Sequence, residues 1–192
     1  IALESSVHDI TRVKATSNIC TAQALLATMS GMYAQYHGPD GLKDIATHIH
    51  STACTLNDAI RDLGYRQLNS NFLDTLKIEL PGRITQEDIR KLSLEKGMNF
   101  FYPEDGPVMI STDEVTTLSE INIISEIFAK AAGKKSAAIG TLSVSGCIEE
   151  RYRRKSSFLK SATFNRYHSE TEMMLYIKML ERKDFSLTHC MI

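Results

Sequence analysis

The hydrophobic periodicity of the chain changes near residue 74, and this change limits the fold classes open to it. Between Pro39 and Gly64, apolar side chains recur every three or four residues, which predicts a helix that ends at Gly64. Leu76, Ile78 and Leu80 then alternate with polar residues, the pattern of a strand with one face toward solvent. Helices and an alternating strand in one chain predict an α+β fold.

The remaining pattern predicts a similar mixture of elements. Further helices are expected at 19–37, 85–97 and 117–132 and from Ser169, and further strands at 99–102 and 108–111. Together these elements predict a small mixed or antiparallel sheet covered by helices, followed by a helical C-terminal extension.

Charge and hydropathy argue against two classes of partner. The 22 Lys and Arg residues nearly balance 23 Asp and Glu, giving a net charge of −1 and no overall basic field for nucleic acid. No apolar run approaches the roughly 18 to 20 residues that span a bilayer, and no targeting segment opens the chain. We therefore expect a soluble protein that binds neither nucleic acid nor membrane. The four cysteines form no CxxC pair, which favours buried, reduced thiols.

Few side chains offer chemistry for a site. His48 and His50 would share a metal only on a strand; on the predicted helix they point about 200° apart, so no metal site is expected. The other histidines, including His168, are interpreted as surface or capping residues. Common catalytic and nucleotide-binding motifs are absent from the sequence.

Two local patterns leave alternatives open. Thr16, Ser17 and Asn18 stand at a predicted helix start behind two cations, where they form either an anion nest or a simple N-cap. The basic tract 151–160 either binds a polyanion, stays solvated, or docks on the acidic stretch 104–126.

Two motifs resemble one known family. The first spans Arg12–Gln23 and Met32–Leu42, and the second spans Phe164–Met174 and Leu180–Asp184. Both are similar to glycine dehydrogenase (decarboxylating), the P-protein of the glycine cleavage system, in its fused single-chain type.

The resemblance implies a pyridoxal phosphate enzyme with two related halves on a fold-type I transferase-like scaffold, of which this chain is a fragment. Residues 1–38 would lead from a large domain outside the chain, and 39–133 would form the C-terminal small domain of the first half. Residues 134–163 would be a linker, and 164–192 would begin the second, catalytic half. Thr16, Ser17 and Asn18 would then lie at an interface loop or beside the assembled site.

The resemblance also implies a reaction for the parent. The parent would decarboxylate glycine with pyridoxal phosphate and transfer the aminomethyl group to the lipoyl group of the H-protein. In the family the cofactor-bearing lysine lies beyond the last residue here, so no catalytic, cofactor-binding or metal residues are expected in this chain.

The expected role of the chain is therefore that of a scaffold, which alone would form a homodimer. Its compartment would be the cytoplasm of a bacterium or the mitochondrial matrix of a eukaryote. A free-standing α+β regulatory module that binds a small metabolite is the alternative, and composition does not separate the two.

Overall fold

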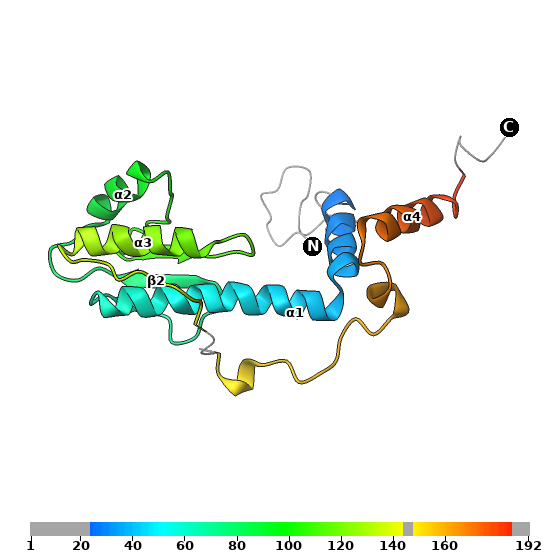
Figure 1. Cartoon of the computed structure of the whole chain (residues 1–192), viewed down its shortest axis with the longest axis horizontal. Coiled ribbons are helices and arrows are strands. Elements are labelled where there is room, and N and C mark those ends of the chain that lie inside the picture. Colours follow the sequence, from blue (N-terminus) through cyan, green and yellow to red (C-terminus); the bar gives the residue numbers. More distant parts are fainter. Residues whose placement is uncertain (1–23, 144–147, 186–192) are drawn as a thin grey trace, which may run out of the picture. The chain divides into compact units, whose positions relative to one another are not determined.

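A computed structural model describes residues 24–143 and 148–185 of the chain (Figure 1). In chain order the elements are α1 (Ala24–Asp62), β1 (Arg66–Gln67), β2 (Thr75–Glu79), α2 (Gln86–Glu95), β3 (Val108–Ser111), α3 (Leu118–Ala131), the short 3₁₀ helices η1 (Glu150–Tyr152) and η2 (Ala162–Asn165), and α4 (Glu170–Glu181). The chain divides into two compact units. Unit 1 holds the described residues 24–39 and 158–185, and unit 2 holds 40–143 and 148–157.

Helix α1 contributes to both units because it is broken at Gly38. Gly38 has non-helical dihedral angles, φ 64° and ψ −177°, and Pro39 follows it. Proline has no N–H and suits the first turn of a helix, so the chain restarts as a helix directly after the break. We call residues 24–37 the first arm of α1 and residues 40–62 the second arm. The predicted pair of helices with a stop between them is confirmed.

Unit 2 is a three-stranded antiparallel sheet with one covered face. The strand order is β1-β2-β3, and Leu76 pairs with Ile110 while Ile78 pairs with Val108. These four side chains are at most 4% exposed, whereas the alternate residues of β2 are partly or fully exposed. Helices α1, α2 and α3 complete the same core with the side chains Leu56, Ile60, Ile89, Ile121, Ile127 and Phe128. The predicted α+β class and the strand with one solvent-facing side are confirmed, and the sheet is antiparallel.

Two strands differ from the sequence prediction. The strand expected at 99–102 is a single bridge, in which the backbone of Phe101 exchanges two hydrogen bonds with Met109. Pro103 follows closely and has no N–H to extend the ladder. The two-residue strand β1 was not predicted because Arg66 and Gln67 show no apolar alternation. Within the described helices, none is long and apolar enough to cross a membrane.

Residues 134–143 run along unit 2 without forming an element of their own. Asn122 binds both backbone groups of Ile139, donating to its carbonyl at 3.1 Å and accepting from its N–H at 2.8 Å. The N–H of Ser143 donates to Thr55 Oγ1 at 2.7 Å. Side chains of the helices thus satisfy backbone groups that a strand partner would otherwise satisfy.

The phenol of Tyr65, the residue before β1, contacts α3 and gives the fold a pH dependence. Its hydroxyl donates to the Phe128 carbonyl at 2.8 Å, and the centroids of the two rings lie 5.0 Å apart. Tyr65 as a whole is only 3% exposed. Burial raises the pKa of Tyr65 to about 12. The phenol therefore stays neutral in the folded chain at a pH where it ionises in the unfolded chain.

We predict that the free energy of unfolding falls as pH rises from about 10 to 12, by up to about 2 kcal/mol from Tyr65 alone. The unfolded phenol loses its proton first in this window, which favours unfolding. Tyr65→Phe should lack this fall and cost about 1 kcal/mol at neutral pH through the lost hydrogen bond. Urea unfolding followed by circular dichroism measures both effects. Tyr152→Phe, at an exposed site, is the control, and equal pH slopes in wild type and Tyr65→Phe would refute the assignment.

Candidate functional site

The predicted loop residues Thr16, Ser17 and Asn18 lie outside the described residues, so their role stays a prediction. His48 and His50 lie on the second arm of α1, as predicted. His50 Nδ1 donates to the Leu73 carbonyl at 2.9 Å, which ties this arm to the segment before β2. Across residues 24–143 and 148–185, no group of three or more His, Cys, Asp or Glu side chains is placed to hold a metal.

Cys54 is a buried thiol one turn after His50. Its Sγ lies 3.5 Å from Nε2 and 4.0 Å from Nδ1 of the His50 ring. A sulfur in line with the Nε2 lone pair would lie much farther from Nδ1, so the thiol sits beside the ring without the alignment of a nucleophile and its base. The predicted structural role fits Cys54; the other three cysteines lie outside the described residues.

The basic tract forms ion pairs with acids next to it in sequence. Arg151 pairs with Glu149 at 2.7 Å and Arg153 pairs with Glu150 at 3.6 Å. In the acidic stretch, Asp105 pairs with Lys77 at 2.8 Å. Of the alternatives for the tract, docking on the acidic stretch is not what these two arginines show, since each pairs with an acid next to it in sequence.

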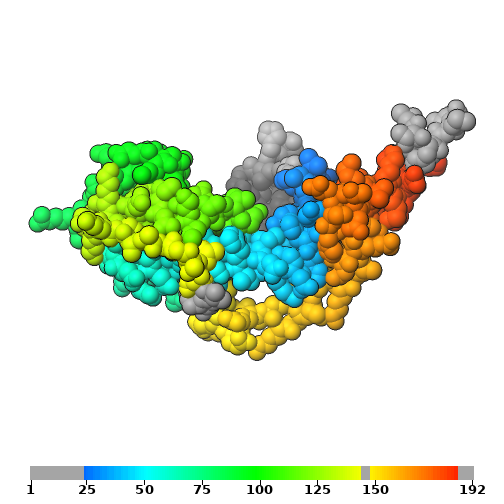
Figure 2. All heavy atoms as spheres, viewed as in Figure 1, coloured from blue at the N-terminus to red at the C-terminus, as the bar shows by residue number. Residues whose placement is uncertain are grey.

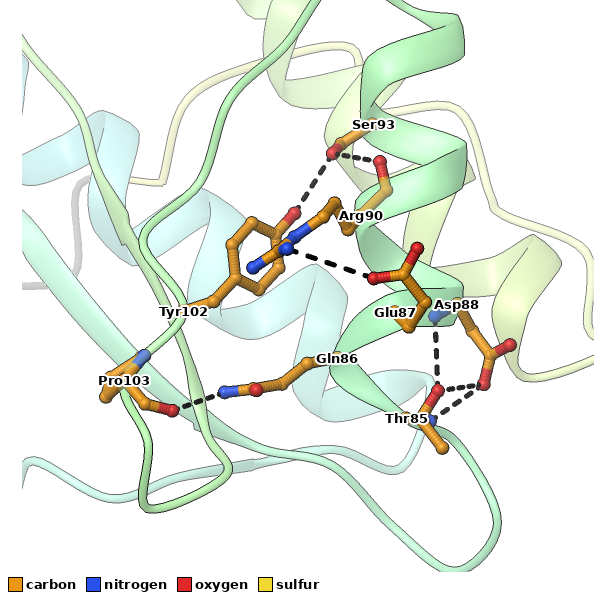
Figure 3. Close-up of polar contacts among 8 residues, drawn as sticks. All are labelled: Thr85, Gln86, Glu87, Asp88, Arg90, Ser93, Tyr102 and Pro103. Carbon is orange, nitrogen blue, oxygen red and sulfur yellow. Dashed lines mark hydrogen bonds and ion pairs between the residues drawn. The ribbon is translucent and has the colours of Figure 1, made fainter.

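A cluster of polar contacts surrounds the first half of α2 (Figure 3). Thr85 and Asp88 form a capping box: the Thr85 hydroxyl accepts from the Asp88 N–H, and the Asp88 carboxylate accepts from the Thr85 N–H at 2.9 Å. The Thr85 hydroxyl also donates to the Asp88 carboxylate at 2.7 Å, and this bond, followed by the one from the Thr85 N–H, holds the pKa of Asp88 below its usual value. The cap explains why the helix begins where the sequence predicts it.

The same helix holds the loop that follows residue 101. Figure 3 shows Gln86 pointing at the loop, where its Nε2 donates to the carbonyls of Pro103 and Pro107 at 2.7 and 2.8 Å. The hydroxyls of Ser93 and Tyr102 lie 3.0 Å apart, and Arg90 stacks on the Tyr102 ring at 4.5 Å. Each contact joins one part of the scaffold to another, so we assign the cluster a structural role.

A second constellation lies in unit 1, where the break of α1 meets the start of α4. His168 Nδ1 donates to the Tyr36 carbonyl at 2.7 Å. A Cβ added to Gly38 would lie 2.8 Å from both His168 Cε1 and the Phe164 carbonyl oxygen. Residues 132 positions apart therefore meet around a glycine that has no room for a side chain.

The sequence did not predict this contact for His168. The sequence predicts a surface or capping histidine. His168 is indeed exposed, and its N–H donates to Glu172 at 3.3 Å at the start of α4. No periodic pattern in the sequence indicates the hydrogen bond between the His168 ring and the Tyr36 carbonyl. For Gly38 the sequence predicts only a helix stop, and it gives no sign that another segment approaches closely.

The comparisons with known proteins place the chain in a family. The sequence model described as Glycine cleavage system P-protein matches residues 1–128, two thirds of the chain. The chain belongs to the glycine cleavage system P-protein family. The resemblance that the two sequence motifs indicated is thereby confirmed.

The relatives that this P-protein chain matches are much longer than the chain itself. It is 46% identical to glycine dehydrogenase (decarboxylating) of Bacteroides thetaiotaomicron and of Christiangramia forsetii, in each case over 100% of this chain and 20% of the relative. The protein of the same description from Nostoc punctiforme is 42% identical, with the same coverage. The chain thus spans about a fifth of the length of the curated relatives that it matches.

A solved structure supports the fold. The crystal structure of glycine decarboxylase (P-protein) of the glycine cleavage system, in inhibitor-bound form, matches with a TM-score of 0.54 and 24% identity. The match covers 62% of this chain and 29% of that chain.

The described lysines do not fit a pyridoxal phosphate site. A lysine that forms a Schiff base is usually desolvated or placed beside another cation. No described lysine is buried, and the partly exposed Lys77 pairs with the carboxylate of Asp105. We therefore assign no step of a cofactor reaction to the described residues.

The structural role of the α2 cluster leads to a test. Thr85→Ala removes the hydroxyl of the capping box and should lower the free energy of unfolding by about 1 kcal/mol, whereas Thr85→Ser keeps the hydroxyl and should lose less than half of that. The carboxylate of Asp88 is stabilised in the fold, so its contribution is present above the usual pKa of an aspartate and is lost on acidification below it. The gap between Thr85→Ala and wild type in urea unfolding should therefore narrow in acid. A loss as large for the serine variant would contradict the cap.

Proposed function

We propose that this chain is a supporting segment of a larger glycine dehydrogenase (decarboxylating) and has no active site of its own. The observation that carries this is the alignment, which uses the whole chain but only a fifth of each relative. The parent would decarboxylate glycine with pyridoxal phosphate and transfer the aminomethyl group to the lipoyl group of the H-protein. The cofactor supplies the electron sink, and this segment contributes position and rigidity.

The proposed division of the chain follows from the family resemblance. Residues 1–38 lead from a large domain, and residues 39–133 form the small α+β domain. Residues 134–163 are a linker to residues 164–192, which begin the catalytic half. Thr16, Ser17 and Asn18 belong to a loop at the interface with the large domain or beside the assembled site. The proposed compartment is the cytoplasm for a bacterial source and the mitochondrial matrix for a eukaryotic one.

The exposed apolar side chains of unit 1 support a role as part of a larger assembly. No described residue of unit 1 has a buried apolar side chain, and the buried apolar residues of the described chain all lie in unit 2. Instead, large apolar side chains are 41–92% exposed along the first arm of α1 and along and after α4: Leu25, Leu26, Met29, Tyr33, Met174, Leu175, Ile177, Met179 and Phe185. Many exposed large apolar side chains are typical of surfaces that other protein covers. We propose that the rest of the parent covers them.

The absence of an active site is tested with the purified chain. We expect the absorption spectrum of pyridoxal phosphate to stay unchanged when the chain is added, and no carbon dioxide to form from labelled glycine. An absorption band of an internal aldimine that disappears when one lysine is changed to arginine would overturn the proposal. Calorimetry with glycine is the second measurement, since tight one-to-one binding would instead indicate a metabolite-binding module.

The apolar surfaces predict self-association of the chain alone. Without the parent, a second copy should cover them, so sedimentation should show a concentration-dependent homodimer. Changing Leu26 and Leu175 together to glutamine should weaken dimerisation about tenfold or more, because each removes an apolar contact worth about 1 to 3 kcal/mol.

Leu94→Gln is the matched control for this experiment. Leu94 is 56% exposed on α2 of unit 2, close to the 58% of Leu26, and lies outside the proposed surface. Its change should leave the dimer intact. Equal weakening by both sets of variants would contradict the assignment of the surface to unit 1.

A further inference from the structure

We propose that the break of α1 forms a docking notch that recognises residues 158–185 by shape and by one hydrogen bond. The notch consists of Gly38 and the carbonyl of Tyr36. Its occupant is the docking segment, residues 158–185, which contains η2 and α4. The inference rests on the proposed function in one respect: it makes the notch the place where the catalytic half begins to bind the first half.

The shape of the notch depends on the missing side chain of Gly38. A Cβ there would lie 2.8 Å from His168 Cε1 and 2.8 Å from the Phe164 carbonyl oxygen. The second neighbour is backbone, which cannot rotate away. A Cβ added to Gly31, in the same arm, would have nothing within 4 Å. The close approach is therefore a property of this position and not of the arm.

The hydrogen bond of the notch also follows from the break. The last carbonyls of a helix lack an N–H partner in the next turn, and Gly38 ends the helical dihedrals of the first arm. Pro39 brings no N–H of its own. The Tyr36 carbonyl, in that last turn, accepts from His168 Nδ1 at 2.7 Å. One interruption of α1 thus supplies both the space for the ring and the acceptor for its proton.

The docking segment presents His168 from a fixed position. Ser169 caps α4, because its side chain accepts from the Glu172 N–H, and the Glu172 carboxylate accepts from the His168 N–H and the Ser169 hydroxyl at 3.3 and 3.1 Å. This cap sets where the backbone of His168 lies relative to the helix. Little further ordering of the residue is then needed for the ring to reach the notch.

The other contact of the notch is also preorganised. Asn165 Nδ2 donates to the carbonyls of Leu159 and Ser161, each at 2.9 Å, which closes the turn around η2. Phe164, whose carbonyl faces Gly38, lies inside this turn. In Figure 2 the orange atoms that follow residue 158 pack against the blue atoms of the first arm. The segment therefore docks as a formed module.

Cutting the chain tests whether docking needs the covalent link. A protease site is inserted between the exposed residues Ser156 and Ser157, the folded chain is cut, and retention of the C-terminal piece is followed by gel filtration over a dilution series. We expect the piece to stay bound in the wild type. Loss of the piece from the cut wild type at all concentrations would overturn the proposal.

Two glycine variants separate shape from backbone strain. Gly38→Ala should raise the dissociation constant of the cut piece about tenfold or more, because the methyl group meets the ring and a backbone oxygen. Gly82→Ala is the matched control: Gly82 has the same φ of 64° but nothing within 4 Å of its Cβ position, so it carries the strain without the clash. Equal retention in the two variants would refute the notch.

Variants of His168 test the hydrogen bond without altering Gly38. His168→Ala leaves the Tyr36 carbonyl without its donor and should weaken retention about tenfold, whereas His168→Asn keeps a side-chain N–H and should recover part of it. Equal retention in His168→Ala and wild type would refute the role of the ring. These readouts involve no cofactor or glycine, so docking and the proposed function fail independently: an aldimine band would overturn the latter and leave the notch intact.

Discussion

The break of α1 at Gly38 is the constraint on which unit 1 depends. Its left-handed φ of 64° suits glycine, the residue with no Cβ to clash, and Pro39 restarts the helix on the far side. The interruption would leave carbonyls of the first arm without partners, and His168 donates to one of them. A local feature of the backbone therefore decides where a segment far along the chain comes to lie.

Unit 2 is held together in a different way. Four apolar side chains of β2 and β3 share one face with residues from three helices, and α2 and α3 each begin with a complete capping box. Burial is non-directional and tolerates small shifts, whereas the caps fix where each helix begins. The loop after Phe101 is held by directional contacts as well, because Gln86 binds two of its carbonyls.

The sequence predicted the elements that are marked by a regular spacing of apolar residues or by a helix-capping residue. The helix stop at Gly38, the strand β2 with one solvent-facing side, the start of α2 behind Thr85 and the start of α4 behind Ser169 follow from nearest neighbours in the chain. Strand β1 has two polar residues and no period, and the bridge at Phe101 is cut short by a proline. The contact of His168 with Tyr36 depends on a backbone carbonyl. Every residue has such a carbonyl, so the residue type at position 36 does not predict the contact. The family motifs pointed to the two segments that meet but gave no reason for their meeting.

The two units therefore place different demands on the chain that carries them. Within the described residues, unit 1 buries no large apolar side chain, and a helix as short as the 12 residues of α4 is marginal alone in water. Non-directional burial inside the unit cannot hold such a segment, so its position must come from directional contacts and from protein that covers its apolar side. The notch supplies the directional contacts, because the Tyr36 carbonyl binds the His168 ring and residue 38 leaves space for that ring only when it has no side chain. The exposed apolar residues of the first arm and of α4 supply apolar area for that covering protein. Both features suit a segment that holds larger parts of the parent in position.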